Sequence, residues 1–471
     1  MELMETLRAG LPPGTLLTEP AAMAPYLLDW RKLYRGQALC VARPRETGEV
    51  ARIVAAAAAA GIAIVPQGGN TGLTGASVPL EAGDSILLSL ERMDKIRAID
   101  APNYTMTVEA GCILQKVQEA AAAADRLFPL SLAAEGSCRI GGNLSTNAGG
   151  IAVLRYGNMR DLTLGIEVVL PDGRIWDGLR ALRKDNTGYD LKQLFIGAEG
   201  TLGVITAAVL KLFPLPRQRV TVFAAASDMA ATLPLLARLR EASGDALTSY
   251  EMIPRVALEF AMAHVPGSFD PFDKPHDPYL LIELTAGASV VDLRALIEPA
   301  LASALEDGLL ADATIAESEA RADRLWFLRE AVVEAQSAAG ASIKHDIAVP
   351  LSAVPSFLGE AKPALEAALP GVTVYAFGHL GDGNIHFNLL QPLAMAAADF
   401  LARTGALNRL VHDLVARHGG SISAEHGLGR LRREEIARYK PAIEIELMRR
   451  IKAALDPQGI MNPGKLLPAK H

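Results

Sequence analysis

Hydrophobic and polar residues alternate along this chain with two different repeats, and these repeats predict its helices and strands. Apolar residues spaced three and four apart predict amphipathic helices, and short apolar or alternating runs between turn residues predict strands. Gly61 ends the clearest helix, because glycine readily takes the left-handed C-terminal position. The predicted helices are 46–60 and 113–124, and the predicted strands are 62–66, 85–90, 105–109 and a hairpin of 164–170 with 174–176.

This pattern changes along the chain and predicts three segments. Residues 1–35 read as an irregular helical lead-in, and 38–215 alternate short strands, helices and glycine-rich turns. Beyond Pro214–Pro216, strand–helix–helix–strand units predict a second, α+β domain. With 471 residues the chain is too long for one ordinary core. We expect a first domain over 1–216, a second over 217–415, and a C-terminal segment, 416–471, that returns to the first.

Composition excludes several functional classes. The formal net charge of −7 gives no electrostatic footprint for nucleic acid. The three cysteines, Cys40, Cys112 and Cys138, are far apart, which argues against a disulfide framework, a zinc ribbon or a cysteine-ligated iron–sulfur cluster. No apolar run approaches the roughly 20 residues that a membrane span needs. We therefore expect a cytoplasmic protein without a membrane span.

Three glycine-rich segments in the first half are candidates for ligand binding: 66–75, 136–150 and 197–203. Glycine lets backbone N–H groups curl around an anion and allows close approach. The spacing fits neither the dinucleotide fingerprint nor the P-loop. One such loop can be a plain flexible turn. Three in one domain predict a long ligand with a pyrophosphate and a ring.

A histidine motif in the second half predicts metal chemistry. His379 and His386 flank Asp382-Gly383, a strong hairpin-turn pair. If those two residues form the turn, His379 faces His386, with Cβ atoms about 5 Å apart. Glu425 would complete a set with an open position, which is typical of a catalytic metal. The alternative is a polar hairpin with two surface histidines.

These motifs together resemble one family. The three glycine segments, the 379–386 and 425–426 motifs and the Asn462-Pro-Gly end are similar to the vanillyl-alcohol-oxidase-type flavoproteins, closest to the D-2-hydroxyglutarate and D-lactate dehydrogenase group. Segments 183–197 and 329–346 favour the D-2-hydroxyglutarate type. The resemblance implies an α+β protein: a two-subdomain FAD-binding domain with an α+β cap domain.

The resemblance also implies a cofactor site in the first domain. Some relatives tether FAD through a histidine there, but all nine histidines lie at 264 or later, so we expect non-covalent FAD. The implied cofactor-binding residues are Pro66, Gly68, Gly69, Asn70, Thr71, Gly72, Leu73, Gly136, Ser137, Gly141, Gly142, Ser145, Thr146, Asn147, Gly149, Gly150, Glu199, Gly200, Gly203, Ile205 and Asn462.

The implied substrate site uses residues of the second half. His379, His386 and Glu425 match the family's ligands of a divalent metal, with Zn²⁺ expected first and Mn²⁺, Co²⁺ or Fe²⁺ as alternatives. Val333 stands where the family has a threonine, which favours a shorter diacid or an apolar tail. The matched substrate and catalytic residues are the base His426, the carboxylate binders Arg329 and Lys344, and the substrate contact Asn388.

The implied function is oxidation of a D-2-hydroxy acid (2-hydroxyglutarate, malate or lactate class) to the 2-oxo acid. Adjacent residues cannot be assigned from sequence, so Glu425 and His426 could exchange roles. The chain has no haem or iron–sulfur motif, so we expect an external acceptor: an electron-transfer flavoprotein, a quinone, a cytochrome, or oxygen if the site admits it. Family habit implies a homodimer. The alternatives are a sugar or lactone oxidase on the same fold and a flavin-binding subunit of a larger oxidase complex.

Overall fold

The computed structural model describes residues 2–244, 246–287, 292–336, 338 and 340–469. The chain forms two compact units. Unit 1 comprises Met1–Gly150, Gly157–Leu215 and Glu425–His471, and unit 2 comprises Ile151–Tyr156 and Pro216–Ala424. Apart from the short segment Ile151–Tyr156, the chain passes into unit 2 at Pro216, and it returns to unit 1 at Glu425, after the last helix of unit 2.

The first sheet of unit 1 has four strands in the order β1-β2-β4-β3, with β2, β4 and β3 parallel. Helix α3 packs Val50, Ile53 and Ala57 against it. This helix ends at Gly61, whose φ of 64° is left-handed, as the sequence predicted. The elements here are α1 (Glu2–Gly10), β1 (Leu16–Leu17), α2 (Pro20–Met23), the 3₁₀ helix η1 (Ala24–Tyr26), β2 (Cys40–Ala42), α3 (Thr47–Ala60), β3 (Ala63–Gln67) and β4 (Ser85–Ser89).

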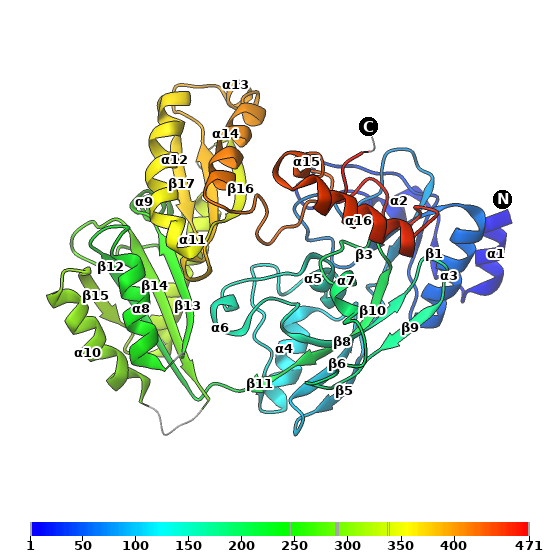
Figure 1. Ribbon diagram of the computed structural model, residues 1–471, viewed down its shortest axis with the longest axis horizontal. Helices are drawn as coiled ribbons and strands as arrows, with labels where there is room; N and C mark the ends of the chain where they lie inside the picture. The colour runs from blue at the N-terminus through cyan, green and yellow to red at the C-terminus, as the bar shows by residue number, and fades with distance from the viewer. Residues whose placement is uncertain (1, 245, 288–291, 337, 339, 470–471) are drawn as a thin grey trace. The chain divides into compact units, whose positions relative to one another are not determined.

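The second sheet of unit 1 is antiparallel, in the order β5-β6-β10-β8-β9 (Figure 1). The predicted hairpin is confirmed as β8 and β9, and the predicted helix 113–124 as α4. The elements are β5 (Ile96–Asp100), β6 (Thr105–Glu109), α4 (Leu114–Ala123), β7 (Arg126–Leu127), α5 (Ile140–Thr146), β8 (Thr163–Val169), β9 (Ile175–Gly178), α7 (Lys192–Phe195), β10 (Val204–Lys211) and β11 (Phe213–Pro214).

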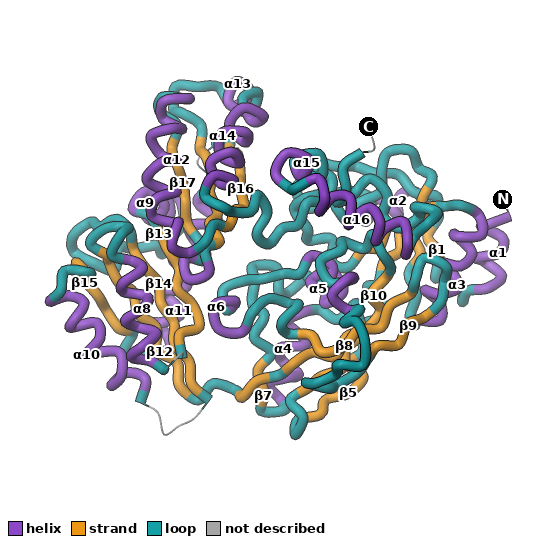
Figure 2. Tube along the Cα trace, in the orientation of Figure 1, coloured by secondary structure: helices purple, strands orange, loops and turns teal. Residues whose placement is uncertain are grey.

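The C-terminal segment completes unit 1. Met461 forms a parallel bridge with Ile64 of β3, and its side chain is buried in the same core as α3. Residues 425–435, which precede the helices of this segment, are loop (Figure 2). The helices are α15 (Ile436–Tyr439) and α16 (Ala442–Leu455).

The first sheet of unit 2 has the order β13-β14-β12-β15 and is antiparallel. Helices α8 and α10 lie side by side on one face of it (Figure 1). Helices α9 and α11 share a buried cluster with Phe223 and Leu281 of this sheet. The elements are α6 (Val153–Tyr156), β12 (Gln218–Ala226), α8 (Thr232–Ser243), β13 (Leu247–Ile253), α9 (Arg255–His264), β14 (Tyr279–Ala286), α10 (Leu293–Glu306), β15 (Leu310–Ile315) and α11 (Glu319–Ala335).

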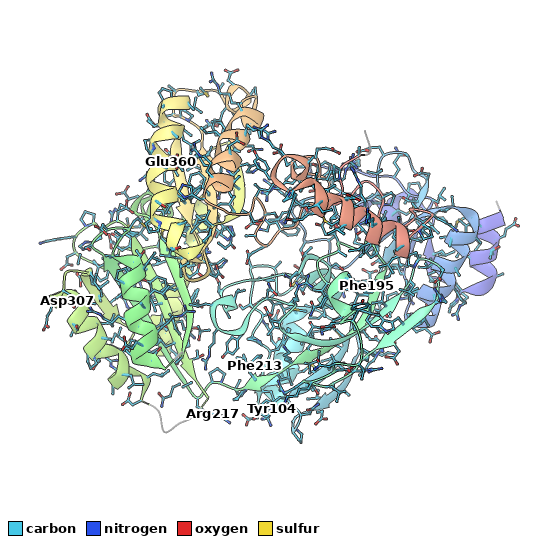
Figure 3. The ribbon with its side chains drawn as sticks, in the orientation of Figure 1. Tyr104, Phe195, Phe213, Arg217, Asp307 and Glu360 are labelled. Carbon is cyan, nitrogen blue, oxygen red and sulfur yellow. The ribbon has the colours of Figure 1, made fainter. Side chains whose placement is uncertain are left out.

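The second sheet of unit 2 has the order β16-β18-β17. Tyr375 and Phe377 of β17 belong to the cluster around α9 and α11, so one core serves both sheets of this unit. On α12, Glu360 (Figure 3) accepts hydrogen bonds from Arg417 (2.6 Å) and pairs with His418 (2.9 Å), which ties α12 to the end of α14. The elements are β16 (Ser342–Ala348), η2 (Leu351–Ala353), α12 (Val354–Ala368), β17 (Thr373–Phe377), η3 (Leu380–Asp382), β18 (Asn384–Leu390), α13 (Ala397–Leu401) and α14 (Thr404–Arg417).

Among the described residues, one isolated bridge joins the two sheets of unit 2. Met252 of β13 and Gly378, just after β17, exchange backbone hydrogen bonds of 2.8 and 3.1 Å. Because this pair is antiparallel, the preceding residue of one strand lies beside the following residue of the other. Among the described residues, no helix is long and apolar enough to cross a membrane.

Candidate functional site

A pocket in unit 1 gathers all three glycine-rich segments and the C-terminal segment. Its lining includes residues at the end of β3, at the start of β10 and along α5. The predicted cofactor residues that line it are Pro66, Gly68, Gly69, Asn70, Thr71, Gly72, Gly141, Gly142, Ser145, Thr146, Glu199, Gly200, Gly203, Ile205 and Asn462.

Other predicted cofactor residues lie outside this lining. Asn147 ends α5 in the left-handed region (φ 51°), and its Oδ1 accepts a hydrogen bond from the backbone N–H of Arg160 at 2.9 Å. It therefore shapes the loop rather than the pocket wall. The predicted residues outside the lining are Leu73, Gly136, Ser137, Asn147, Gly149 and Gly150.

Asn462 holds the three chain segments around the pocket together. Its side-chain amide donates to the carbonyls of Ala76 (3.1 Å) and Glu199 (2.7 Å), and its backbone N–H donates to that of Ile64 (2.8 Å). It is 2% exposed and has a left-handed φ of 43°. A short side chain that both tolerates this conformation and donates twice favours asparagine here.

The pocket has features that fit a flavin nucleotide. The amide oxygens of Asn143 and Asn462 are buried and make no hydrogen bond among the described residues. Buried acceptors of this kind normally have a partner, and flavin rings and ribityl chains carry suitable donors. A Cβ at Gly72 or Gly142 would meet no atom within 4 Å, so these glycines border open space.

His426 lines this same pocket. The hydroxyl of Thr74 donates to its carbonyl at 3.3 Å. Downstream, the Glu199 carboxylate accepts the backbone N–H groups of Leu428 and Gly429, both at 2.8 Å. Glu199 therefore uses its carboxylate to fix the backbone next to His426.

In unit 2, one face of the β16-β18-β17 sheet collects polar side chains. Directly opposed residues of an antiparallel pair share a face, and residues two apart along a strand do as well. The register pairs Lys344 with Asn388 and Asp346 with His386, so these four side chains lie on one face. Lys344 is exposed and His386 half-buried, whereas Asp346 and Asn388 are buried.

The predicted register of the histidine hairpin is wrong. His386 pairs with Phe377 rather than with His379. The chain leaves the ladder at Gly378 to bridge Met252, and residues 380–382 form a 3₁₀ turn, so the connection is longer than a two-residue turn. The two imidazoles nevertheless meet: their ring centroids are 5.4 Å apart, and their ligand atoms lie within 4.8 Å.

Arg329 approaches this face from α11. Its guanidinium lies 4.8 Å above the centre of the Phe377 ring, and Nε donates to the Glu251 carboxylate at 2.7 Å. The other oxygen of Glu251 pairs with Nδ1 of His379 at 2.6 Å. Burial alone would raise the pKa of Glu251, but the charges and hydrogen bonds of His379 and Arg329 outweigh it and hold that pKa at about 2.

Asn388 is committed to bonds within unit 2. Its Nδ2 donates to Gln336 at 2.7 Å, and its Oδ1 accepts the backbone N–H of His345 at 3.2 Å. An amide fixed on both sides presents its second N–H in a set direction.

Two carboxylates of this region were not predicted from the sequence: Glu251, and Asp346 as a ligand, although the ligand atoms of Asp346 and His386 lie within 4.8 Å of one another. A signal existed for both. Glu251 is the only charged residue of β13, in which every residue is buried. Asp346 is two residues from Lys344 on a strand and so shares its face.

Glu425 is the first residue of the returning segment of unit 1. The preceding residue, Ala424, belongs to unit 2, where its backbone N–H donates to the Asp346 carbonyl at 3.2 Å. The candidate third ligand thus follows directly on a residue that is tied to the polar sheet face.

Comparison with known proteins gives two matching family models. The model described as "FAD binding domain" matches residues 38–178. The model described as "FAD linked oxidases, C-terminal domain" matches residues 215–466, more than half of the chain. These two matches place the chain among FAD-binding proteins, as the sequence predicted.

Several named relatives match almost the whole chain. The D-2-hydroxyglutarate dehydrogenase of Xanthomonas citri is 39% identical, over 98% of this chain and 96% of its own. The mitochondrial D-2-hydroxyglutarate dehydrogenase of Bos taurus is also 39% identical, over 97% of this chain and 82% of its own. The D-2-hydroxyglutarate–pyruvate transhydrogenase of Saccharomyces cerevisiae is 36% identical, over 95% and 90%.

Solved structures agree on the fold. p-Cresol methylhydroxylase aligns with a TM-score of 0.76 at 17% identity, covering 99% of this chain and 96% of that one. Alkyldihydroxyacetonephosphate synthase aligns with 0.74 at 18% identity, covering 98% and 84%. The expected vanillyl-alcohol-oxidase-type α+β fold is confirmed. The chain belongs to the FAD-linked oxidases, as an oxidoreductase of the group that contains the D-2-hydroxyglutarate dehydrogenases.

Proposed function

We propose that this protein is a flavin-dependent dehydrogenase that oxidises a D-2-hydroxy acid to the 2-oxo acid. The observation that carries the proposal is the polar face in unit 2. Lys344, Asn388 and His386 lie on this face, the Arg329 guanidinium packs on Phe377 opposite His386, and the ring of His379 lies beside that of His386; such groups suit the binding of a hydroxy acid. The names of the relatives support the same substrate class.

Arg329 and Lys344 bind the substrate carboxylates. A guanidinium presents paired N–H groups that match both oxygens of a carboxylate, whereas Lys344 contributes a compact second charge. Among the described residues, Arg329 uses only Nε in hydrogen bonding. Its terminal amino groups therefore suit a carboxylate. Asn388 donates to the substrate from the same sheet face.

His379, His386 and Glu425 hold a divalent metal, with Zn²⁺ expected first and Mn²⁺, Co²⁺ or Fe²⁺ as alternatives. Two imidazoles and one carboxylate with an open position form a typical catalytic set. The 5.4 Å separation of the imidazole rings supports a shared ion. The carboxylate on Nδ1 of His379 supports it too, because it leaves the lone pair on Nε2.

When bound, the metal would activate the alcohol electrophilically, and the flavin would accept its hydride. His426 accepts the hydroxyl proton as general base. The hydroxyl of Thr74 donates a hydrogen bond to the His426 carbonyl. The Glu199 carboxylate accepts the backbone N–H groups of Leu428 and Gly429 and so fixes the chain that follows His426. Arg329 keeps the substrate carboxylate fixed, so that the Cα–H bond has one direction.

Val333 limits the substrate at its far end. It lies one turn after Arg329 on α11, is 43% exposed, and cannot donate a hydrogen bond. A shorter diacid such as D-malate, or an acid with an apolar tail, is therefore a stronger candidate than the relatives' names alone suggest.

Electrons leave for an external acceptor: an electron-transfer flavoprotein, a quinone or a cytochrome. The sequence carries no motif for a second redox centre. We also propose a homodimer and a reducing compartment such as the cytoplasm. The latter suits three free, buried cysteines.

Anaerobic bleaching of the flavin band tests the proposal. D- and L-lactate, malate, 2-hydroxyglutarate and mandelate would be added to the purified flavoprotein, before and after chelation. We expect bleaching by D-acids only, lost on chelation and restored by Zn²⁺. His426→Asn should lower kcat/KM by about 10²–10⁴-fold. Bleaching that survives complete metal removal would exclude the metal role. No bleaching by any acid would favour a sugar or lactone oxidase, or a flavin-binding subunit.

A further inference from the structure

Glu251 lies between two parts of the proposed site that have different tasks. It belongs to β13, and the antiparallel bridge between Met252 and Gly378 brings the next pair, Glu251 and His379, side by side. Arg329 reaches the same carboxylate from α11. All the elements involved belong to unit 2, so this placement depends on one compact core.

Both oxygens of the Glu251 carboxylate make short contacts, each with a different side chain. One carboxylate oxygen accepts from Arg329 Nε at 2.7 Å, and the other pairs with His379 Nδ1 at 2.6 Å. The side chains of Glu251, His379 and Arg329 are 1%, 8% and 9% exposed. Hydrogen bonds to a charged group in such surroundings are about twice as strong as neutral ones. Each carboxylate oxygen therefore holds a different side chain in place, Arg329 or His379.

A buried carboxylate in this position is costly unless both partners remain. Removing one partner of a buried ion pair is strongly destabilising, because it leaves the other charge buried and uncompensated. Glycine, serine or an apolar residue would be simpler if β13 needed only to fill its core.

We infer that Glu251 is a positioning residue that couples the substrate-carboxylate clamp, Arg329, to the metal-binding imidazole, His379. This inference rests on the proposed function and deepens it. By accepting Nδ1–H, Glu251 selects the tautomer of His379 whose Nε2 binds a metal. By accepting Nε–H, it sets the plane of the Arg329 guanidinium against the Phe377 ring. A change at Arg329 therefore alters the affinity of the metal site.

The first test measures Zn²⁺ affinity, which is independent of turnover. Metal-depleted flavoprotein with Glu251→Gln would compete with a chromophoric chelator for Zn²⁺. We expect affinity to fall about 10–100-fold, the usual effect of losing the carboxylate behind a ligating histidine. Glu283→Gln is the matched control: Glu283 is 13% exposed, lies on the same sheet and accepts from Arg219 at 2.7 Å. It should leave Zn²⁺ affinity within about twofold.

The second test asks whether the clamp and the metal are coupled. Arg329→Met carries no metal ligand away, so it should change Zn²⁺ affinity only through Glu251. In a double-mutant cycle with Glu251→Gln, we expect the effects on Zn²⁺ affinity to depart from additivity by more than about threefold. Additive effects would overturn the coupling, and equal Zn²⁺ affinity in Glu251→Gln and Glu283→Gln would overturn the positioning role.

Folding and function are kept apart by two further measurements. If Glu251→Gln does not fold, Glu251→Asp replaces it: the charge is kept, but the shorter side chain cannot hold both partners. Weakened Zn²⁺ binding in folded Glu251→Asp supports the inference, and unchanged binding refutes it. If the unaltered protein binds Zn²⁺ yet no 2-hydroxy acid bleaches its flavin, the proposed function fails, whereas the coupling is judged by the cycle alone.

Discussion

At the scale of single residues, Lys465 stands out because it is a buried cation whose ammonium makes no hydrogen bond among the described residues, although the charges of Glu81 and Glu199 act on it. It is 3% exposed. Burial, followed by the charges of Arg430 and Arg433, lowers the pKa of Lys465 to about 7. The Asn462-Pro-Gly-Lys465 run was visible in the sequence, but the burial of its last residue was not.

This shift predicts how stability depends on pH. An ordinary lysine has a pKa of 10.5, so between pH 7 and 10.5 the unfolded chain binds one more proton than the folded chain. Stability therefore rises with pH across that window, and the penalty is complete below pH 7. In flavin-free protein, Lys465→Met should be more stable than the parent by on the order of 3 kcal/mol at pH 6.5, and by much less at pH 9.5.

Urea denaturation at both pH values measures this difference. Lys116→Met, at an exposed position of α4, provides the control and should show no trend with pH. An advantage of Lys465→Met that stays constant from pH 6.5 to 9.5 would show that Lys465 does not titrate near 7.

At the scale of elements, the segment from β17 to β18 decides how the two histidines meet. Its turn depends on Gly383, which has a φ of 83° and ends the 3₁₀ turn η3. A Cβ at Gly383 would lie 2.2 Å from the Val349 carbonyl oxygen. The left-handed backbone disfavours any residue with a Cβ. The close approach of the Val349 carbonyl leaves no space for a side chain.

Gly383→Ala should therefore damage both the fold of unit 2 and the proposed metal site. We expect a loss of about 2–4 kcal/mol of unfolding free energy, from backbone strain and steric overlap together. Zn²⁺ affinity should also fall, because Gly383 lies between His379 and His386. Guanidinium denaturation followed by circular dichroism, with the chelator competition described above, measures both.

Gly359→Ala on α12 is the matched control. A Cβ there would meet no atom within 4 Å, and the residue lies inside a helix. Alanine should stabilise by about 0.5–1 kcal/mol. If Gly383→Ala and Gly359→Ala change the unfolding free energy alike, the turn geometry at Gly383 does not stabilise the segment from β17 to β18.

At the scale of the whole molecule, the chain passes between two units that have separate cores. The core of unit 1 runs from Leu7 to Met461, and that of unit 2 from Phe223 to Leu390. The residues that fit a flavin line a pocket of unit 1, and the polar sheet face belongs to unit 2.

Flavin should therefore stabilise the units unequally. A ligand at 100 times its dissociation constant adds about 2.7 kcal/mol to the state that binds it. In calorimetry, adding FAD to the flavin-free protein should raise one unfolding transition by about 5–10 °C and leave the other unchanged. Gly383→Ala identifies the transition of unit 2, because it should lower only that one. A single transition that moves as a whole would show that the units unfold together.

The sequence alone determined the features that depend on local chemistry. Helix α3 and its stop at Gly61 follow from apolar spacing and from the left-handed preference of glycine. Strand β6 and the β8–β9 hairpin follow from alternation and turn residues. The three glycine segments and the histidine motif supported the family, because few folds combine them.

Only the tertiary structure decided the features that depend on distant segments. The register of His386 with Phe377 arose because Gly378 pairs with Met252, more than a hundred residues earlier in the chain. The same bridge brought Glu251 to His379. Turn propensity is local and could not report a competing partner from another sheet, and the low-energy position of a buried charge is set by partners that only folding brings together.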